Sequence, residues 1–203
     1  MKKGLFCVLE GLDGAGGSTQ TNLLKEFFEK KNIPCVFVKS PEYETEIGQS
    51  IRDYLDGKIN LKPEQAFLLF AMDVLNSVPI IKEGLGKNKI VIADRYITST
   101  IAYQCANGFS YENALKFTKL HKYPEPDAII FINIKPETSM ERKMKEHGKL
   151  DRHEKDSKFL KKVRSLYQKE IKENILGKWF VIDGEKNIKD VHEDILKIIN
   201  SLK

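Results

Sequence analysis

The residues best suited to chemistry lie in a glycine-rich segment near the start of the chain. Residues 11–19 follow an apolar run and precede a helical pattern, and Gly11, Gly16 and Ser18 match the spacing G-x-x-x-x-G-K-[ST] of a phosphate-binding loop. Glycines let such a loop curl until successive backbone N–H groups point at phosphate oxygens, and the helix N-terminus adds the positive end of a dipole. The Ser18 hydroxyl is the expected ligand of Mg²⁺. The segment therefore predicts a nucleotide phosphate site.

One position of the loop departs from the pattern. Gly17 stands where the pattern has Lys, whose charge normally stabilises the β- and γ-phosphates. The shape for holding phosphate is kept and one transition-state charge is lost. Two interpretations stay open: a phosphate-binding loop, or a glycine-rich turn between strand and helix that binds no ligand. On the first interpretation, the residues that bind the ATP phosphates are Gly11, Gly14, Gly16, Gly17, Ser18 and Thr19.

A second polar segment follows another apolar run. Asp94-Arg95-Tyr96 comes directly after residues 90–93. An Asp at a strand end can hold Mg²⁺ through water, and an adjacent Arg can bind a phosphate through two parallel hydrogen bonds. The alternative is a surface salt bridge at the end of a strand. Because ligands of open α/β sheets bind at the carboxyl ends of the strands, the position favours a functional role, with Ser18 and Asp94 organising Mg²⁺.

These segments need a sheet to position them, and the chain has the pattern of one. Five short apolar runs without alternation predict buried parallel strands, and helical patterns lie between them. The fold class is therefore α/β, with a central five-stranded parallel sheet and helices on both faces, in one domain spanning residues 1–203. The predicted strands are 5–9, 35–38, 90–93, 129–134 and 179–182, and the predicted helices are 18–31, 63–85, 136–146, 159–175 and 188–202.

Composition excludes several other classes of protein. Of 203 residues, 41% are hydrophobic, which supplies a core and excludes a mainly disordered chain. No run of about 18 apolar residues predicts a membrane span. Cys7, Cys35 and Cys105 lie far apart, without the spacing of a disulfide framework or a zinc site. We therefore expect a cytoplasmic protein without a membrane partner.

The charge is uneven along the chain. Residues 135–164 contain 11 Lys and Arg against 6 Asp and Glu, within a formal net charge of +5. Such a stretch is usually a solvated helical surface, and otherwise meets an anionic partner. It contains few aromatic residues for stacking on bases, so we do not expect a nucleic-acid partner. Within it, residues 141–156, named the lid here, carry many charges and no apolar stripe, and we expect them to be mobile.

Because several blocks of residues follow one another in the order found in a known family, the chain resembles the thymidylate kinases. The resemblance covers nearly the whole chain and implies a P-loop kinase fold, transfer of the γ-phosphoryl group from ATP to dTMP with Mg²⁺, and a homodimer. The matching blocks are residues 10–16 with Ser18-Thr19-Gln20, Lys39-Ser40-Pro41-Glu42 with residues 45–48, Leu68-Leu69-Phe70-Ala71, Asp94-Arg95-Tyr96 with Ser99 and Ala102-Tyr103-Gln104, and residues 150–154 followed by Phe159 and Tyr167.

The resemblance also implies roles for individual residues. Asp13 is expected near the acceptor sugar, and Arg95 is expected to hold the acceptor phosphate. Phe70 is expected to stack on the base and Gln104 to bond its polar edge, although an apolar Phe on a helix is more often part of a core. Tyr103 is expected to pack against the sugar. The full acceptor set is Asp13, Lys39, Phe70, Arg95, Ser99, Tyr103 and Gln104.

The lid is the expected source of further charge. Some family members carry a catalytic Arg in the phosphate loop at the position of Gly14, and others supply basic residues from the lid, which is the pattern here. Arg142 and Arg152 are expected to be the functional pair, catalytic together with Asp13 and Arg95, and Arg142 is expected against the adenine or its phosphates. The alternative for Arg152 is an ion pair with Asp151. The lysines Lys143, Lys145 and Lys149 are expected to face solvent, and the alternative is that one of them, such as Lys143 or Lys149, replaces the missing lysine of the loop.

Two further departures concern the acceptor. Val74 stands where the family commonly has an Arg that contacts the base, and Lys39 stands where an Arg commonly reaches the acceptor phosphate. Lys neutralises a phosphate but cannot make the forked contact of Arg. Together with Gly17, these departures leave alternatives to a dTMP kinase: relaxed base specificity toward dUMP or UMP, or a catalytically weakened relative that only binds nucleotide.

Overall fold

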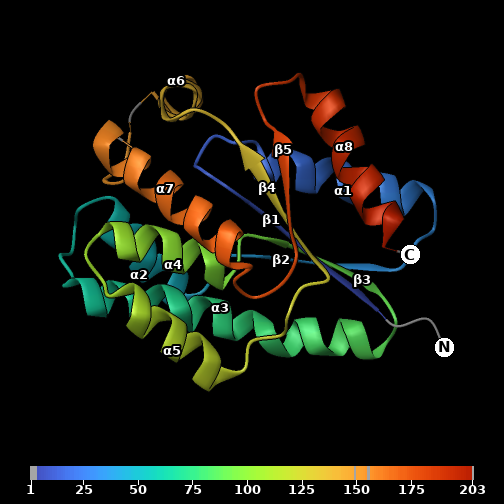
Figure 1. Ribbon diagram of the computed structural model, residues 1–203, viewed down its shortest axis with the longest axis horizontal. Helices are drawn as coiled ribbons and strands as arrows, with labels where there is room; N and C mark the ends of the chain where they lie inside the picture. The colour runs from blue at the N-terminus through green and yellow to red at the C-terminus, as the bar shows by residue number, and fades with distance from the viewer. Residues whose placement is uncertain (1–3, 149, 155, 203) are drawn as a thin grey trace.

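A computed structural model describes residues 4–148, 150–154 and 156–202 of the chain, around a central sheet (Figure 1). The strand order is β2-β3-β1-β4-β5, and every neighbouring pair is parallel. All five strands lie where the apolar runs predicted them, which confirms the α/β class. They are β1 (Leu5–Gly11), β2 (Cys35–Lys39), β3 (Ile90–Asp94), β4 (Ala128–Asn133) and β5 (Trp179–Asp183).

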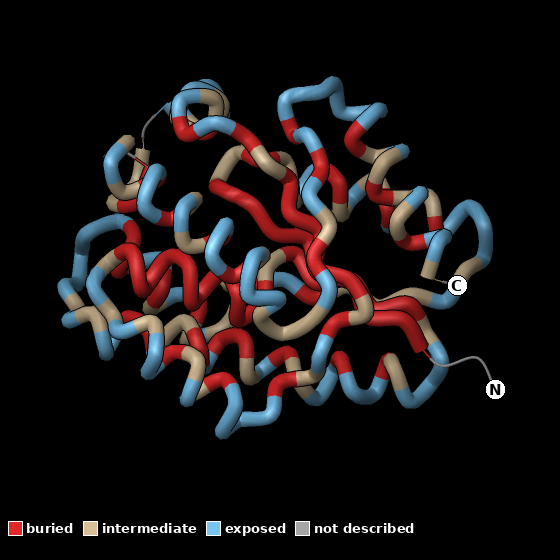
Figure 2. Tube along the Cα trace, viewed as in Figure 1, coloured by how far each residue is buried: buried red, intermediate tan, exposed pale blue. Residues whose placement is uncertain are grey.

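The strands are apolar on both sides because helices cover both faces of the sheet (Figures 1 and 2). Every residue of β1 and β3 is buried. One face carries α1 (Gly17–Lys30) and α8 (Ile188–Ser201), and the other carries α3 (Pro63–Gly86), α4 (Ile97–Ala106) and α7 (Ser157–Glu173). Further helices pack outside these: α2 (Glu46–Leu55) on α3, α5 (Tyr111–His121) on α4, and α6 (Pro136–His147) on α7.

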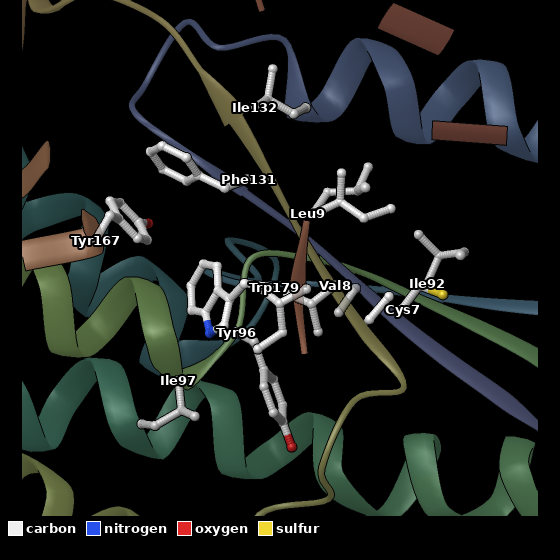
Figure 3. Close-up of a cluster of buried hydrophobic side chains, with 14 of the residues drawn as sticks. Cys7, Val8, Leu9, Ile92, Tyr96, Ile97, Phe131, Ile132, Tyr167 and Trp179 are labelled. Carbon is white, nitrogen blue, oxygen red and sulfur yellow. The ribbon is translucent and has the colours of Figure 1, made fainter. Parts of the chain in front are cut away.

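The core on the α7 side is rich in aromatic side chains. Tyr167 of α7 lies beside Phe131 of β4, with their ring centroids 4.9 Å apart (Figure 3). Tyr96, at the start of α4, meets Phe6 of β1 edge to face at 5.3 Å. Tyr96 and Tyr167 are both almost fully buried. These contacts fix α4 and α7 on the sheet, next to the strand ends from which the polar segments leave.

The strand register brings those polar segments to one edge of the sheet. Leu9 of β1 is level with Asp94 of β3 and with Ile130 of β4, and Lys39 of β2 is level with Asp94. The loop after β1 and the segment after β3 therefore leave the sheet side by side. Both motifs predicted to bind phosphate share this edge.

Three helices, α2, α4 and α5, were missed by the periodicity analysis. All ten residues of α4 are buried, so no polar face marks it as an amphipathic helix. Helix α2 is only ten residues long and contains Gly48, which contacts the backbone of Glu42 too closely for any side chain. Helix α5 is also short, with 11 residues, and begins at the cap residue Ser110. Short or fully buried helices lack the long polar–apolar pattern on which such predictions depend.

Helix α3 also departs from expectation. With 24 residues, it satisfies the length and composition of a membrane-spanning helix, although no such segment was expected. In the fold, one side of α3 packs on β2 and β3, where Phe67 and Ala71 are buried. The other side carries Leu68, Met72 and Ile80, each about half exposed. This packing is that of a core helix whose outer face remains apolar.

Candidate active site

A cleft of about 1850 Å³ opens at the carboxyl edge of the sheet. It is lined by the phosphate loop, by residues of α6, by residues of α2 and α3, and by the turn at residues 150–154, which packs against Tyr54 of α2. A pocket for one small ligand commonly has 300–1,000 Å³. The cleft therefore has room for two nucleotides placed end to end.

The loop at the floor of the cleft is shaped by its glycines. Gly14 and Gly16 have φ of 75° and 97°, in the left-handed region that favours glycine. Gly16 is the N-cap of α1 and carries no side chain, so no side-chain oxygen caps the first N–H groups of that helix. Those groups, together with the curled backbone, face the cleft, and all six predicted phosphate-binding residues line it. The arrangement is suited to an anion.

A carboxylate lies close to the position of the missing lysine. A Cβ placed on Gly17 would lie 2.7 Å from Asp94 Oδ1, which is closer than atoms can approach without a shift. The other carboxylate oxygen, Oδ2, accepts a hydrogen bond of 2.8 Å from the Ser18 hydroxyl. Gly17 and Asp94 are thus fitted to each other, and a side chain at position 17 would push Asp94 away from Ser18.

The Ser18–Asp94 pair fits Mg²⁺ bound together with nucleotide. Within the described residues, no group of three His, Cys, Asp or Glu side chains could hold a metal ion by itself. Mg²⁺ usually takes only one or two protein oxygens and completes its shell with phosphate oxygens and water. One hydroxyl and one carboxylate beside a phosphate loop are therefore a sufficient protein contribution.

Arg95 lies at the centre of the acceptor side, held against the phosphate loop. It adopts a left-handed backbone conformation with φ of 71°, and Nη2 lies 2.5 Å from Asp13 Oδ1. Nη1 donates to the Gly11 carbonyl oxygen at 2.9 Å. The Tyr103 hydroxyl donates to Asp13 Oδ2 at 3.0 Å and accepts from the Asp13 N–H. Burial works against the charged guanidinium, but Asp13 keeps the pKa of Arg95 above its ordinary value.

A buried carboxylate supports this arrangement from below. Glu10 of β1 accepts hydrogen bonds from the hydroxyl groups of Thr98 at 2.6 Å, Tyr167 at 2.8 Å and Ser99, and from the N–H groups of Tyr96 and Ser99 at 3.1 Å. Burial raises the pKa of Glu10. The network ties β1 to α4 and α7, directly beneath Arg95. We name Glu10, Asp13, Arg95, Ser99, Tyr103 and Tyr167 the sheet-edge cluster.

Sequence reasoning assigned no role to Glu10 or Thr100. Glu10 could have been found, because a charged residue that ends an apolar strand is expensive to bury without partners. Thr100 is buried and lines the cleft beside Ser99. The neighbouring motif was read only for residues matching the family, so Thr100 was passed over.

The predicted acceptor residues separate into two groups. Lys39, Phe70, Ser99 and Tyr103 line the cleft, as does Val74 on the same face of α3 as Phe70. Phe70 is only partly buried and lies 6.2 Å from the Tyr54 ring. Its ring is therefore open to the cleft, as a stacking residue requires.

Gln104 belongs to the other group. It is fully buried, does not line the cleft, and neither atom of its amide group has a hydrogen-bond partner. In this structure its amide does not reach the cleft, so the expected contact with the base stays a prediction. It lies one helical turn after Thr100, which does line the cleft, so its amide is buried behind that residue.

The two lid arginines lie on opposite sides of the cleft. Arg142 of α6 donates to the carbonyl oxygens of Gly14 at 3.2 Å and Gly184 at 3.1 Å, so it bridges the phosphate loop and the loop after β5. Arg152 turns the other way, with its guanidinium 4.4 Å from the Tyr54 ring centroid and Nη2 donating to Asn60 Oδ1 at 2.8 Å. Both arginines line the cleft, but they do not lie together, and their functional roles stay predictions.

The described residues of the lid form a helix and a turn. Helix α6 continues to His147, so the first part of the lid is helical. Asp151 then closes a turn through hydrogen bonds from the N–H groups of His153 and Glu154, and it makes no ion pair with Arg152 among the contacts described. The turn brings His153 and Glu154 into the interior, where both are buried.

The lid lysines also differ from one another. Lys145 faces solvent as expected, with 75% of its side chain exposed, and pairs with Glu141. The Lys143 side chain is only 14% exposed and lies 2.9 Å from Glu146 and 3.4 Å from Glu154. Lys149 lies outside the described residues. The expectation of solvent-facing lysines is therefore wrong for Lys143.

Comparison with known proteins gives one consistent family. The family model for thymidylate kinase matches residues 9–195. The thymidylate kinase of Fervidobacterium nodosum is 35% identical over 202 residues, which cover 97% of this chain and 99% of the relative. That of Schizosaccharomyces pombe is 30% identical over 200 residues, covering 98% and 93%. The solved thymidylate kinase of Candida albicans, whose structure addresses that enzyme's broad substrate specificity, has a TM-score of 0.78 at 25% identity, covering 98% of this chain and 92% of that one.

Proposed function

The chain belongs to the thymidylate kinase family, and from this premise we propose that its cleft transfers the γ-phosphoryl group of ATP to dTMP, giving ADP and dTDP. The chain is thus a phosphotransferase with ATP as donor. One observation carries the proposal: the phosphate loop and Arg95 face the same cleft, with the Ser18–Asp94 pair beside them. A turn that binds no ligand would not need this convergence of anion-binding groups.

We assign the donor site to the phosphate loop. The backbone N–H groups of residues 13–19 cradle the ATP phosphates at the N-terminus of α1. Ser18 and Asp94 hold Mg²⁺, which neutralises phosphate charge when it is bound. Arg142 joins the loop to the segment at Gly184, and these contacts support its assignment to the adenine or its phosphates.

We assign the acceptor site to the opposite half of the cleft. Phe70 stacks on the base, and Tyr103 packs on the sugar from α4. Asp13 has two functions: it orients Arg95 through their ion pair and lies at the boundary between donor and acceptor. Arg95 and Lys39 hold the acceptor phosphate in line with the donor.

The reaction does not require a general base. The attacking oxygen of dTMP is already anionic at neutral pH, so no proton has to be removed before attack. The protein contributes alignment and positive charge around the moving phosphoryl group, and exclusion of water by the lid limits hydrolysis of ATP.

The outer face of α3 supports a homodimer. Leu68, Met72 and Ile80 of this helix are 47–49% exposed, and apolar side chains left exposed on one helix are candidates for an interface. Met72→Glu is expected to convert a dimer into a monomer in sedimentation velocity, with Lys82→Glu near the end of the same helix as control. A wild-type monomer at all concentrations would contradict the dimer.

The three free thiols suit a reducing compartment, and we assign the protein to the cytoplasm.

The test of the function is ADP production from ATP–Mg²⁺ in the presence and absence of dTMP, with dUMP and UMP as alternative acceptors. We expect ADP release that depends on dTMP and forms dTDP in equal amount. Binding of both nucleotides without dTDP would favour a protein that only binds nucleotide. ADP release that ignores dTMP would contradict the acceptor site.

A further inference from the structure

The phosphate loop lacks its usual cation at Gly17. A Cβ at this position would lie 2.7 Å from Asp94 Oδ1, so a larger residue requires the Asp94 side chain to shift. Phosphoryl transfer still develops negative charge that needs a cation near the β- and γ-phosphates. The charge must therefore come from another residue that faces the loop.

Three arginines that line the cleft are already held by other groups. Arg142 is held by two backbone carbonyls, and Arg95 is paired with Asp13 on the acceptor side. Arg152 is stacked on Tyr54 across the cleft. Lys143 lies above the loop, and two of its partners, Glu146 and Glu154, belong to the lid.

Helix α6 holds Lys143 over the phosphate loop. The Ser139 hydroxyl donates to the Asp13 carbonyl oxygen at 2.6 Å, which fixes the helix on the loop one turn before Lys143. The Cγ of Lys143 lies only 3.3 Å from where a Cβ on Gly14 would be. The lysine stem therefore runs along the middle of the loop, inside the same cleft as Gly17 and Ser18.

The carboxylates around Lys143 keep its ammonium group charged, and a phosphate can replace them as its partner. Burial works against the ammonium, but Glu146 and Glu154 raise the pKa of Lys143 above its ordinary value. Glu154 belongs to the turn of the lid, and its Oε2 accepts from the Asp151 N–H. A flexible four-carbon stem lets an ammonium leave one anion for another nearby. A phosphate bound in the loop competes with these carboxylates for the same charge.

We propose that Lys143 supplies to the ATP phosphates the positive charge that the loop lacks at Gly17. The proposal rests on the kinase activity proposed above and assigns one of its charges. The ion pair with Glu154 makes the delivery of this charge depend on the position of the lid. The cation that acts on the ATP phosphates therefore belongs to the lid and not to the phosphate loop.

The test compares four variants with the wild-type enzyme in steady-state assays of dTDP formation. Lys143→Met removes the charge and keeps the shape, and kcat is expected to fall by about 10² or more while the KM for dTMP changes little. Lys143→Arg is expected to retain more activity than Lys143→Met. Lys145→Met, on the same helix but in solvent, is expected to stay within about twofold of wild type.

The fourth variant, Glu154→Gln, distinguishes a catalytic role of Lys143 from a structural one. It breaks the same ion pair but leaves the cation, so kcat is expected to stay within about threefold of wild type if Lys143 acts on phosphate. If Lys143 only tethers the lid, Lys143→Met and Glu154→Gln will lose activity equally, and the proposal is overturned. Activity of Lys143→Met close to wild type also overturns it. Absence of dTDP formation by the wild-type enzyme would instead refute the proposed function.

Discussion

The sheet-edge cluster and the lid supply charge to the same cleft in two different ways. In the cluster, Glu10, Arg95 and Tyr167 come from β1, the end of β3 and α7, and each contacts the others or their immediate neighbours. In the lid, ion pairs such as Lys145–Glu141 join residues one helical turn apart and lie in solvent. Groups fixed by several elements are preorganised, whereas groups fixed by their own helix can change partners. The cluster is therefore suited to positioning the acceptor, and the lid to closing over the donor.

The largest effect should come from removing the central cation of the cluster. Arg95→Met is expected to lower kcat/KM by at least about 10³-fold, because it removes the acceptor-phosphate contact and leaves Asp13 without its partner. The matched change in the lid, Arg152→Met, should cost less than about tenfold, since Arg152 is turned toward Tyr54. Steady-state kinetics on both variants measures the difference. Equal losses would contradict the distinction between the two regions.

Substitutions in the sheet-edge cluster should also lower the free energy of unfolding more than substitutions in the lid. Glu10→Ala is expected to lower the free energy of unfolding by about 3–5 kcal/mol, because it leaves three hydroxyl and two N–H groups buried without their acceptor. Glu141→Ala in the lid breaks an exposed ion pair and should leave the free energy of unfolding nearly unchanged. Urea unfolding gives both values. A Glu10 variant as stable as the Glu141 variant would show that the buried network is dispensable.

A smaller effect is expected from restoring the lysine of the loop. Gly17→Lys should lower kcat by about tenfold rather than raise it, because the new Cβ displaces Asp94 from Ser18. Gly17→Ala is the control, since it adds the same Cβ without the charge and should be equally impaired. A gain of activity in Gly17→Lys alone would show that the missing charge outweighs the fit of Asp94, and that the lid does not replace it.

The sequence predicted the sheet-edge region well because its signals are local. Strands covered on both faces are continuous apolar runs, and Asp94-Arg95 follows such a run directly, so the fold class and the phosphate edge could be placed. The burial of Gln104 depends on how α4 is rotated, which its uniformly buried residues do not reveal. The direction of Arg152 depends on Tyr54, almost 100 residues earlier in the chain. Contacts of that kind come from tertiary packing and leave no periodicity to read.

The smallest effects should come from two titrating groups inside the lid, and they have opposite signs. Burial raises the pKa of Asp151 to about 6 and lowers that of His153 to about 4. Between pH 4 and 6 the folded protein keeps a proton on Asp151 that the unfolded chain releases, so this group makes the fold less stable as pH rises. Between pH 4 and 6.5 the unfolded chain binds a proton on His153 that the fold excludes, so this group makes the fold less stable as pH falls.

Removing either group should therefore leave the pH dependence of stability that the other group causes. Relative to wild type, Asp151→Asn should become less stable as pH is lowered from 6.5 to 4, and His153→Gln should become more stable, each by about 1–2 kcal/mol across the window. Urea unfolding at pH 4.5, 5.5 and 6.5 measures both, with Lys145→Met expected to run parallel to wild type. Parallel profiles for all three variants would mean that the lid opens to water before the protein unfolds. In that case the lid would be independent of the sheet-edge cluster in stability as well as in chemistry, because its buried groups would titrate as they do in solvent.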